Sequence, residues 1–177
     1  AFYGPKIDIF VPDAIGRDWQ LGTVQLDFSL PERFDLEYAS EDGTRQRPVV
    51  VHRAMYGSLE RFLGVLIEHL AGAFPLWIAP VQAVVVPIAD RHNDYCHEVG
   101  AKLTAAGIRV EVNDSNDRMN SKIRQAQLQK VPYMLVAGDR EVGSATVAVR
   151  TRTGENLDPM SADGIVKKFL KQITDKS

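Results

Sequence analysis

Residues 48–70 constrain the fold more than any other stretch, because they combine a strand pattern and a helix pattern across one short break. The apolar run 49–51 is typical of a buried strand. From Leu59 onward, apolar residues recur at helical spacing, and Ser58 is a good N-cap. We therefore predict a strand that ends near His52 and a helix that begins after Ser58.

Arg61 lies in the first turns of that predicted helix. A helix N-terminus attracts anions, because its first N–H groups are unpaired and its dipole end is positive. An arginine adds a fork of donors that suits phosphate. The pattern is equally compatible with a surface arginine on a helix that packs on a sheet, so both interpretations stay open at this point.

The stretch before this helix is rich in strand patterns. Four strands are expected, over residues 6–11, 23–28, 35–38 and 47–52. The Asp42-Gly43 pair between the last two is a strong hairpin signal. Consecutive antiparallel strands followed by one amphipathic helix indicate an α+β arrangement, with the helix on one face of the sheet.

The pattern of apolar residues changes after residues 71–82. The prolines and bulky apolar groups of this stretch suggest a packed connector and a domain boundary. We place the domains at 1–78 and 79–177. In the second domain strands are expected at 83–88, 108–112, 131–137 and 146–150, and helices at 91–106, 119–129 and 161–173. Alternating strands and helices predict an α/β fold with a mixed, mostly parallel sheet.

Bulk properties are those of an ordinary globular protein, with 45% hydrophobic and 25% charged residues. No run approaches the roughly 20 apolar residues of a membrane span, and the first residues do not resemble a signal peptide. The single cysteine, Cys96, fits a reducing compartment. We expect a cytoplasmic protein without a membrane partner. The net charge of −2 permits an RNA partner without arguing for one.

Generic ligand motifs are weak in this chain. Neither common glycine-rich nucleotide fingerprint is present, and the stretch 138–143 lacks the lysine of a phosphate loop. His92, Cys96 and His97 do not have the spacing of a zinc site. His52, taken alone, is by default a satisfied core histidine. Any nucleotide or metal site must therefore be of another kind.

Residues 52–69 contain His-Arg-Ala followed by Gly-Ser-Leu-Glu-Arg-Phe, and they resemble the third signature motif of class II aminoacyl-tRNA synthetases. The particular residues resemble the form of this motif in the threonyl-tRNA synthetase family. Further stretches resemble the same family in the same order, namely Ala1–Asp8, Trp19–Phe28, Phe74–Gln82 and Lys130–Val136. The resemblance covers essentially the whole chain. It implies the end of a class II catalytic domain, an antiparallel-sheet fragment, followed by an α/β anticodon-binding domain.

The resemblance also implies roles for particular residues. In the catalytic part these are catalysis for Lys6, Gln25 and Arg61, ATP binding for Gln20, Ser58 and Arg61, and threonine binding for Tyr3, Lys6 and Gln25. In the anticodon-binding part, Glu141 and Arg150 match base-reading positions of the family, and Arg124 with neighbouring Arg118 or Lys122 is expected to contact the RNA backbone. From the residues alone, Ser58 is also explained as a helix cap, Lys6 as a solvated lysine at a strand edge, and Glu141 and Arg150 as solvated charges at strand ends.

Two cofactors follow from the resemblance. His52 matches the third zinc ligand of the family, whose zinc engages the amino and hydroxyl groups of threonine, and a site that engages a hydroxyl rejects an isostere without one. The other two ligands, a Cys and a His, would precede residue 1. Mg²⁺ would accompany ATP. The loop 113–117 departs from the family by being less basic, which puts a phosphate role for it in doubt.

The resemblance thus implies a threonine–tRNA ligase that uses ATP, threonine and tRNA(Thr) and is a homodimer at full length. We expect the isolated 177-residue chain to be inactive in adenylate formation. One alternative is a non-catalytic tRNA-binding fragment or paralogue of a class II synthetase. Another is a prolyl or glycyl enzyme with a related second domain, although His52 and the Tyr3–Lys6 wording favour the threonyl family.

Overall fold

The computed structural model describes residues 3–176 and divides them into two compact units, 1–71 and 72–177. Ala1 and Phe2, which begin one of the resembling stretches, lie outside the described residues. Leu76 and Ala79, from the expected connector, are buried in the second unit. None of the helices within residues 3–176 is long and apolar enough to cross a membrane.

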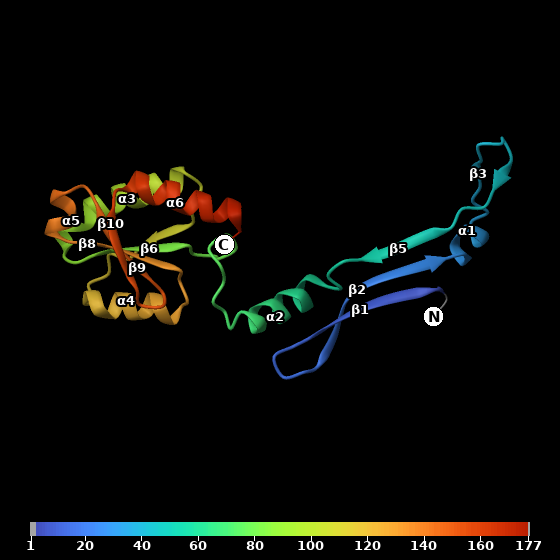
Figure 1. Ribbon diagram of the computed structural model, residues 1–177, viewed down its shortest axis with the longest axis horizontal. Helices are drawn as coiled ribbons and strands as arrows, with labels where there is room; N and C mark the ends of the chain where they lie inside the picture. The colour runs from blue at the N-terminus through green and yellow to red at the C-terminus, as the bar shows by residue number, and fades with distance from the viewer. Residues whose placement is uncertain (1–2, 177) are drawn as a thin grey trace. The chain divides into compact units, whose positions relative to one another are not determined.

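The antiparallel sheet predicted for the first unit is present, with three strands in the order β1-β2-β5 (Figure 1). Its strands are β1 (Lys6–Pro12), β2 (Asp18–Asp27) and β5 (Val50–Ala54). The helix α2 (Leu59–His69) follows, with Ser58 as its N-cap. The predicted strand that ends near His52 and the helix after Ser58 are therefore both present. The prediction that this strand is buried was wrong, because Val49 is 45% exposed and Val51 is 56% exposed.

The segment between β2 and β5 differs from the expectation. A short helix α1 (Ser29–Arg33) follows β2, and the strand expected at 35–38 is reduced to β3 (Tyr38–Ala39). Asp35 has a φ of 51°, in the left-handed region, which breaks an extended strand. The hairpin predicted at Asp42-Gly43 exists, with β3 paired to β4 (Arg45–Gln46) in a separate two-stranded sheet.

The second unit contains a mixed five-stranded sheet in the order β10-β9-β8-β6-β7. Its strands are β6 (Ala83–Pro87), β7 (Val110–Val112), β8 (Tyr133–Ala137), β9 (Val147–Thr151) and β10 (Asn156–Met160). β6 pairs parallel with β7 and β8, whereas β9 pairs antiparallel with β8 and β10. The mixed sheet was expected from the sequence, but β10 was not.

Helices cover both faces of this sheet (Figure 1). The helices and the single 3₁₀ turn are η1 (Asp90–His92), α3 (Asn93–Ala105), α4 (Met119–Leu128), α5 (Asp139–Gly143) and α6 (Ala162–Asp175). Apolar side chains of α3 and α6 share one buried cluster with Val85 and Leu135, and those of α4 share a second cluster with Val84 and Met134. Because neighbouring residues of a strand point to opposite faces, these clusters lie on the two sides of the sheet.

Candidate functional site

The sheet of the first unit carries a row of polar side chains on one face. Strand pairing places Lys6 opposite Gln25 and Gln25 opposite His52. Directly opposite residues of antiparallel strands project from the same face, with β-carbons about 4.5–5.5 Å apart. The ring of Tyr3 lies 5.4 Å from the ring of His52, measured between centroids. The structure therefore brings together all three residues predicted to bind threonine, beside the predicted metal ligand.

Asp8 connects two of the predicted site residues. Its Oδ2 atom lies 2.8 Å from the ammonium nitrogen of Lys6, and its Oδ1 atom accepts a hydrogen bond of 2.7 Å from the side-chain amide of Gln20. The hydrogen bond from Lys6 lowers the pKa of the Asp8 carboxyl below its ordinary value. Lys6 is thus held by an ion pair at the start of β1.

His52 contacts a carboxylate that the sequence analysis did not single out. Its Nε2 atom lies 2.8 Å from Oδ2 of Asp27, whose side chain is fully buried. Burial opposes ionisation of Asp27, but hydrogen bonds from His52 and from the main-chain N–H groups of Leu30 and Ser29 outweigh it and lower the pKa of the carboxyl. His52 is a partly exposed residue with a buried partner on one side.

The hydrogen bonding of His52 is compatible with the role of a zinc ligand. The imidazole of His52 has one nitrogen hydrogen-bonded to Asp27 and, among residues 3–176, no hydrogen-bond partner for the other, which is how a metal-binding histidine is usually held. Within residues 3–176 no group of three or more His, Cys, Asp and Glu side chains could hold a metal ion. His52 therefore fits the role of one zinc ligand among several, and the described residues do not supply the others.

Arg61 lies where the helix pattern placed it, in the first turn of α2. Its main-chain N–H donates to the Ser58 hydroxyl at 3.1 Å, so Ser58 does act as a helix cap. The Arg61 Nη1 atom donates to the main-chain oxygen of Gln20 at 3.0 Å, and the guanidinium lies 5.7 Å from the centroid of the Trp19 ring. The contact with Gln20 spans two elements and holds an exposed cation near the strand edge, with further donors free for an anion.

A shallow hollow of about 320 Å³ adjoins this arginine. It is lined by Trp19 and Arg61 together with residues of α2, including Glu60 and Glu68. The two carboxylates make the α2 side of the hollow unfavourable for phosphate, because like charges repel. A phosphate group would therefore contact Arg61 from the opposite side, toward the polar face of the sheet.

The predicted anticodon residues lie in different parts of the second unit. Arg118 is the N-cap residue of α4, and Arg124 is exposed on the same helix. Arg150 pairs with Met134 in β8, and therefore lies on the sheet face that α4 covers. Its Nε atom is buried and has no hydrogen-bond partner among residues 3–176. Glu141 belongs to α5, after the end of β8.

These four residues do not converge on one point. Met134 lies near the start of β8 and α5 follows its end, so the strand separates Arg150 from Glu141 by roughly 10 Å along its length, at about 3.3 Å per residue. One carboxylate oxygen of Glu141 accepts from the main-chain N–H of Gly138 at 3.0 Å. The arrangement suits an extended partner, such as a single strand of RNA, better than a compact ligand.

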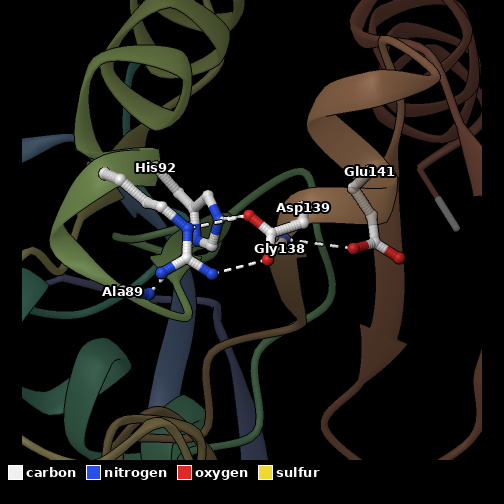
Figure 2. Close-up of polar contacts among 6 residues, drawn as sticks. Ala89, His92, Gly138, Asp139 and Glu141 are labelled. Atoms are coloured by element: carbon white, nitrogen blue, oxygen red, sulfur yellow. Dashed lines mark hydrogen bonds and ion pairs between the residues drawn. The ribbon is translucent and has the colours of Figure 1, made fainter.

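A polar cluster fixes the helix that carries Glu141 (Figure 2). Asp139 accepts hydrogen bonds from Arg91 Nε at 2.8 Å and from His92 Nε2 at 2.9 Å. The Nδ1 atom of His92 accepts from the main-chain N–H of Ala89, which leaves Nε2 as the protonated nitrogen. Hydrogen bonds from Arg91 and His92 hold the pKa of Asp139 well below its usual range. The cluster ties the turn after β6 to the start of α5.

Sequence reasoning missed Asp8, Asp27 and Asp139, although a signal existed for the first two. In β1 and β2 they occupy the same alternating positions as Lys6 and Gln25, so the pattern already placed them on the polar face. Asp139 carried no such signal, because its two partners come from a loop far away in the sequence.

Two family profiles match the chain. The profile described as "Anticodon binding domain" matches residues 82–172. The profile described as "tRNA synthetase class II core domain (G, H, P, S and T)" matches residues 1–70. The two matches follow one another without overlap and fall in the second and first units respectively.

Individual relatives agree with these profiles. A threonine–tRNA ligase of Caldanaerobacter subterraneus is 54% identical over the whole chain, which spans 28% of that relative. Another, from Deinococcus radiodurans, is 57% identical over 88% of the chain, which spans 24% of the relative. The crystal structure of the RNA-binding domain of a threonyl-tRNA synthetase from Cryptosporidium parvum superposes with a TM-score of 0.88 at 41% identity, covering 97% of this chain and 44% of the other. The chain thus spans about a quarter of the length of these two sequence relatives.

Proposed function

We propose that the chain, which belongs to the anticodon-binding-domain family, is the region of a threonine–tRNA ligase that joins the end of the class II core to the anticodon-binding domain. In this proposal residues 1–78 complete the catalytic site and residues 79–177 read the anticodon. The reaction is ATP-dependent activation of threonine and its transfer to tRNA(Thr). The ligase is a cytoplasmic homodimer at full length.

The polar row on the first sheet is the observation that carries the catalytic part. Lys6, Gln25 and His52 lie side by side on three strands, and Tyr3 packs against His52. An amino acid needs both charged and hydrogen-bonding partners to be held in one orientation, and this row offers them within a few ångströms. We assign threonine binding to Tyr3, Lys6 and Gln25, with Lys6 and Gln25 also orienting the reacting carboxylate.

ATP binding is assigned to the start of α2. Arg61 presents a guanidinium near the helix N-terminus, where both the side chain and the helix dipole favour a triphosphate. Gln20 contributes through its main-chain carbonyl, which holds Arg61, and Ser58 through the cap that begins the helix. Arg61 would stabilise the charge that develops on the phosphates while threonine attacks. Mg²⁺ would enter with ATP.

Zinc is assigned to His52 together with ligands that the described residues do not supply. When bound, the metal would engage the amino and hydroxyl groups of threonine and thereby discriminate against valine. The residues of this chain hold the histidine and surround the amino acid. The contact between His52 and Tyr3 keeps the metal ligand beside the proposed pocket.

Anticodon reading is assigned to the second unit. Arg150 can donate in a fork to a guanine, and Glu141 can accept from an exocyclic amine with the oxygen that Gly138 leaves free. Arg118 and Arg124 are exposed on α4 and suit the RNA backbone.

Binding of anticodon stem-loops by the 177-residue chain tests the second assignment. The probe is a labelled stem-loop of a threonine tRNA, compared with the same stem-loop whose central anticodon guanine is replaced by adenine. We expect the guanine version to bind at least about fivefold more tightly, as one bidentate contact is worth about 1–3 kcal/mol. Equal affinities would contradict base reading.

Two conservative variants locate the effect. Arg150→Lys keeps the charge but loses the fork, so we expect it to reduce the preference for guanine. Arg140→Lys makes the same change at an exposed residue of α5 with no assigned role. If Arg150→Lys and Arg140→Lys changed the preference for guanine equally, Arg150 would not be the residue that recognises the guanine.

Pyrophosphate exchange tests the catalytic assignment. The isolated chain is expected to show no threonine-dependent exchange, and a rate above that of its His52→Ala and Arg61→Ala variants would contradict this. In the complete synthetase we expect Arg61→Ala to lower kcat by about 100–1000-fold, as loss of a charge-stabilising donor does. Arg53→Ala is the matched control, because Arg53 lies on the opposite face of β5 from His52. Exchange that survives Arg61→Ala would favour a non-catalytic tRNA-binding role for this region.

A further inference from the structure

Asp27 is the most deeply buried acidic residue among the described residues of the first unit. It is the last residue of β2, and none of its surface is exposed. Strand pairing sets Gln25 opposite His52 and Asp27 opposite Val50, so Asp27 is the diagonal neighbour of His52 on the polar face. Burying a carboxylate lowers the stability of the fold unless the group is fully hydrogen-bonded, so the hydrogen bonds of Asp27 indicate its role.

The two carboxylate oxygens have separate contacts. Oδ1 accepts main-chain N–H bonds from Ser29 at 2.9 Å and from Leu30 at 3.0 Å, at the start of α1. Within the part of the chain that the structure describes, the hydrogen-bond partner of Oδ2 is the imidazole of His52 alone, at 2.8 Å from Nε2. The contacts of Oδ1 hold the carboxylate plane, and Oδ2 is therefore aimed at one ring nitrogen.

The proton on the imidazole follows from this geometry. An ionised carboxylate only accepts hydrogen bonds, so Nε2 must carry the proton that lies between the two groups. In the neutral ring the lone pair is then on Nδ1. The side chain of His52 is 41% exposed, and its Nδ1 atom has no hydrogen-bond partner among residues 3–176.

We propose that Asp27 is a positioning residue that fixes His52 in the tautomer with a free Nδ1, so that Nδ1 is the atom that binds the metal. The metal role of His52 rests on the proposed function, whereas the tautomer does not. Carboxylate partners of this kind orient metal-binding histidines and raise their basicity. Asp27 acts through His52 and does not itself touch the metal.

Asp27→Asn separates this role from helix capping. Asparagine keeps one oxygen, which can still accept from Ser29 and Leu30, but its NH₂ group then faces Nε2. A donor facing Nε2 favours the tautomer protonated on Nδ1, which removes the lone pair from the metal side. The same exchange of Asp for Asn beside a catalytic histidine stabilises the wrong tautomer in serine proteases.

The tautomer can be measured directly on the 177-residue chain. Long-range ¹⁵N–¹H correlation spectra of the four histidines, with His52 assigned by His52→Asn, distinguish Nε2–H from Nδ1–H at a pH where the ring is neutral. We expect Nε2–H in the unaltered chain and a shift toward Nδ1–H in Asp27→Asn. An Nδ1–H ring in the unaltered chain overturns the proposal without need of any variant.

Zinc affinity in the complete synthetase supplies the second readout, measured by competition with a chromophoric chelator. We expect Asp27→Asn to weaken zinc binding by about 10–100-fold. Asp13→Asn, which removes another buried and hydrogen-bonded carboxylate of the same unit, should leave the affinity unchanged. Loss of zinc in His52→Ala but not in Asp27→Asn would overturn the positioning role alone. Unchanged zinc in His52→Ala would instead overturn the metal role of His52.

Discussion

The two units hold their side chains in place by different kinds of interaction. In the second unit, apolar clusters on both faces of the sheet enclose Leu103, Leu135 and Phe169 with no exposed surface. In the first unit Leu21 and Pro31 are the only buried apolar side chains among the described residues, while two acids, Asp13 and Asp27, are buried. Order in the first unit therefore depends on hydrogen bonds and ion pairs.

The helices show the same contrast. Among the described residues of α2 none is buried, and Leu59, Leu63 and Ile67 are exposed. By comparison, α6 buries Ile165 and Phe169 completely. An amphipathic sequence is thus no guarantee of a buried face, because burial needs an opposing surface. We infer that the second unit is stabilised chiefly by its own core, and that the first unit is a more weakly stabilised support for the polar row.

The largest effect is expected from Leu103→Ala in α3. Removing a fully buried leucine costs its transfer free energy and leaves a cavity, about 2–5 kcal/mol in total. Urea unfolding of the Trp19→Phe chain measures it, because Trp77 then reports on the second unit. A loss below about 1 kcal/mol would show that this cluster does not carry the stability of the unit.

A large kinetic effect is expected at Cys96, which lies in the same cluster. Burial removes the thiol from solvent and raises its pKa to about 11. Since the thiolate is the reactive form, iodoacetamide at pH 8 should modify the folded chain at least about a hundredfold more slowly than the chain in urea. The rate should rise as the pH approaches 11. Mass spectrometry of timed samples measures both rates, and equal rates would mean that the core is open.

A moderate effect of acid is expected in the first unit, at Asp13. The Trp19 indole donates to this carboxylate at 2.9 Å, as does the Arg17 side chain at 2.7 Å. The hydrogen bond from Trp19 is the main cause that lowers the pKa of Asp13 below its ordinary value of 3.8. The carboxylate therefore stabilises the fold fully above that value, and the contribution is lost as the pH falls below it toward the folded pKa.

Trp19 fluorescence in the Trp77→Phe chain measures this dependence. Unfolding midpoints in urea should fall between about pH 4 and pH 2. In Asp13→Asn the midpoint should be lower at neutral pH and should change less over this range. A variant that keeps the full acid dependence would assign the effect to other carboxyls.

The smallest effect is expected from Leu63→Ala in α2, the same substitution as at Leu103. Its side chain is 49% exposed, and an exposed substitution usually changes stability by about 0.5 kcal/mol or less. Urea unfolding of the Trp77→Phe chain is the measurement. If Leu63→Ala lowered the free energy of unfolding as much as Leu103→Ala, the contrast between the two units would be wrong, because the apolar face of α2 would then have to be buried.

Several features could be predicted from the sequence, because they depend on local periodicity. The strand and the helix of residues 48–70, the Ser58 cap, the hairpin at Asp42-Gly43 and the α/β order of the second unit are all short-range patterns. The family resemblance likewise follows from motifs in order, and the profiles confirm it. The roles of individual site residues stay predictions, for which experiments are given above.

What the tertiary structure decided is which residues are partners. Alternation along β2 put Gln25 and Asp27 on one face, but only strand register places them next to His52, 25 residues further along than Asp27. The hydrogen bonds from Gln20 to Asp8, from Arg61 to the Gln20 carbonyl and from His92 to Asp139 also join segments distant in sequence. A periodic pattern reports the face on which a side chain lies, whereas its neighbour depends on how strands pair. The sequence by itself therefore determined the family and the longer elements, whereas the short elements α1 and β10 and the contacts between side chains were decided by the fold.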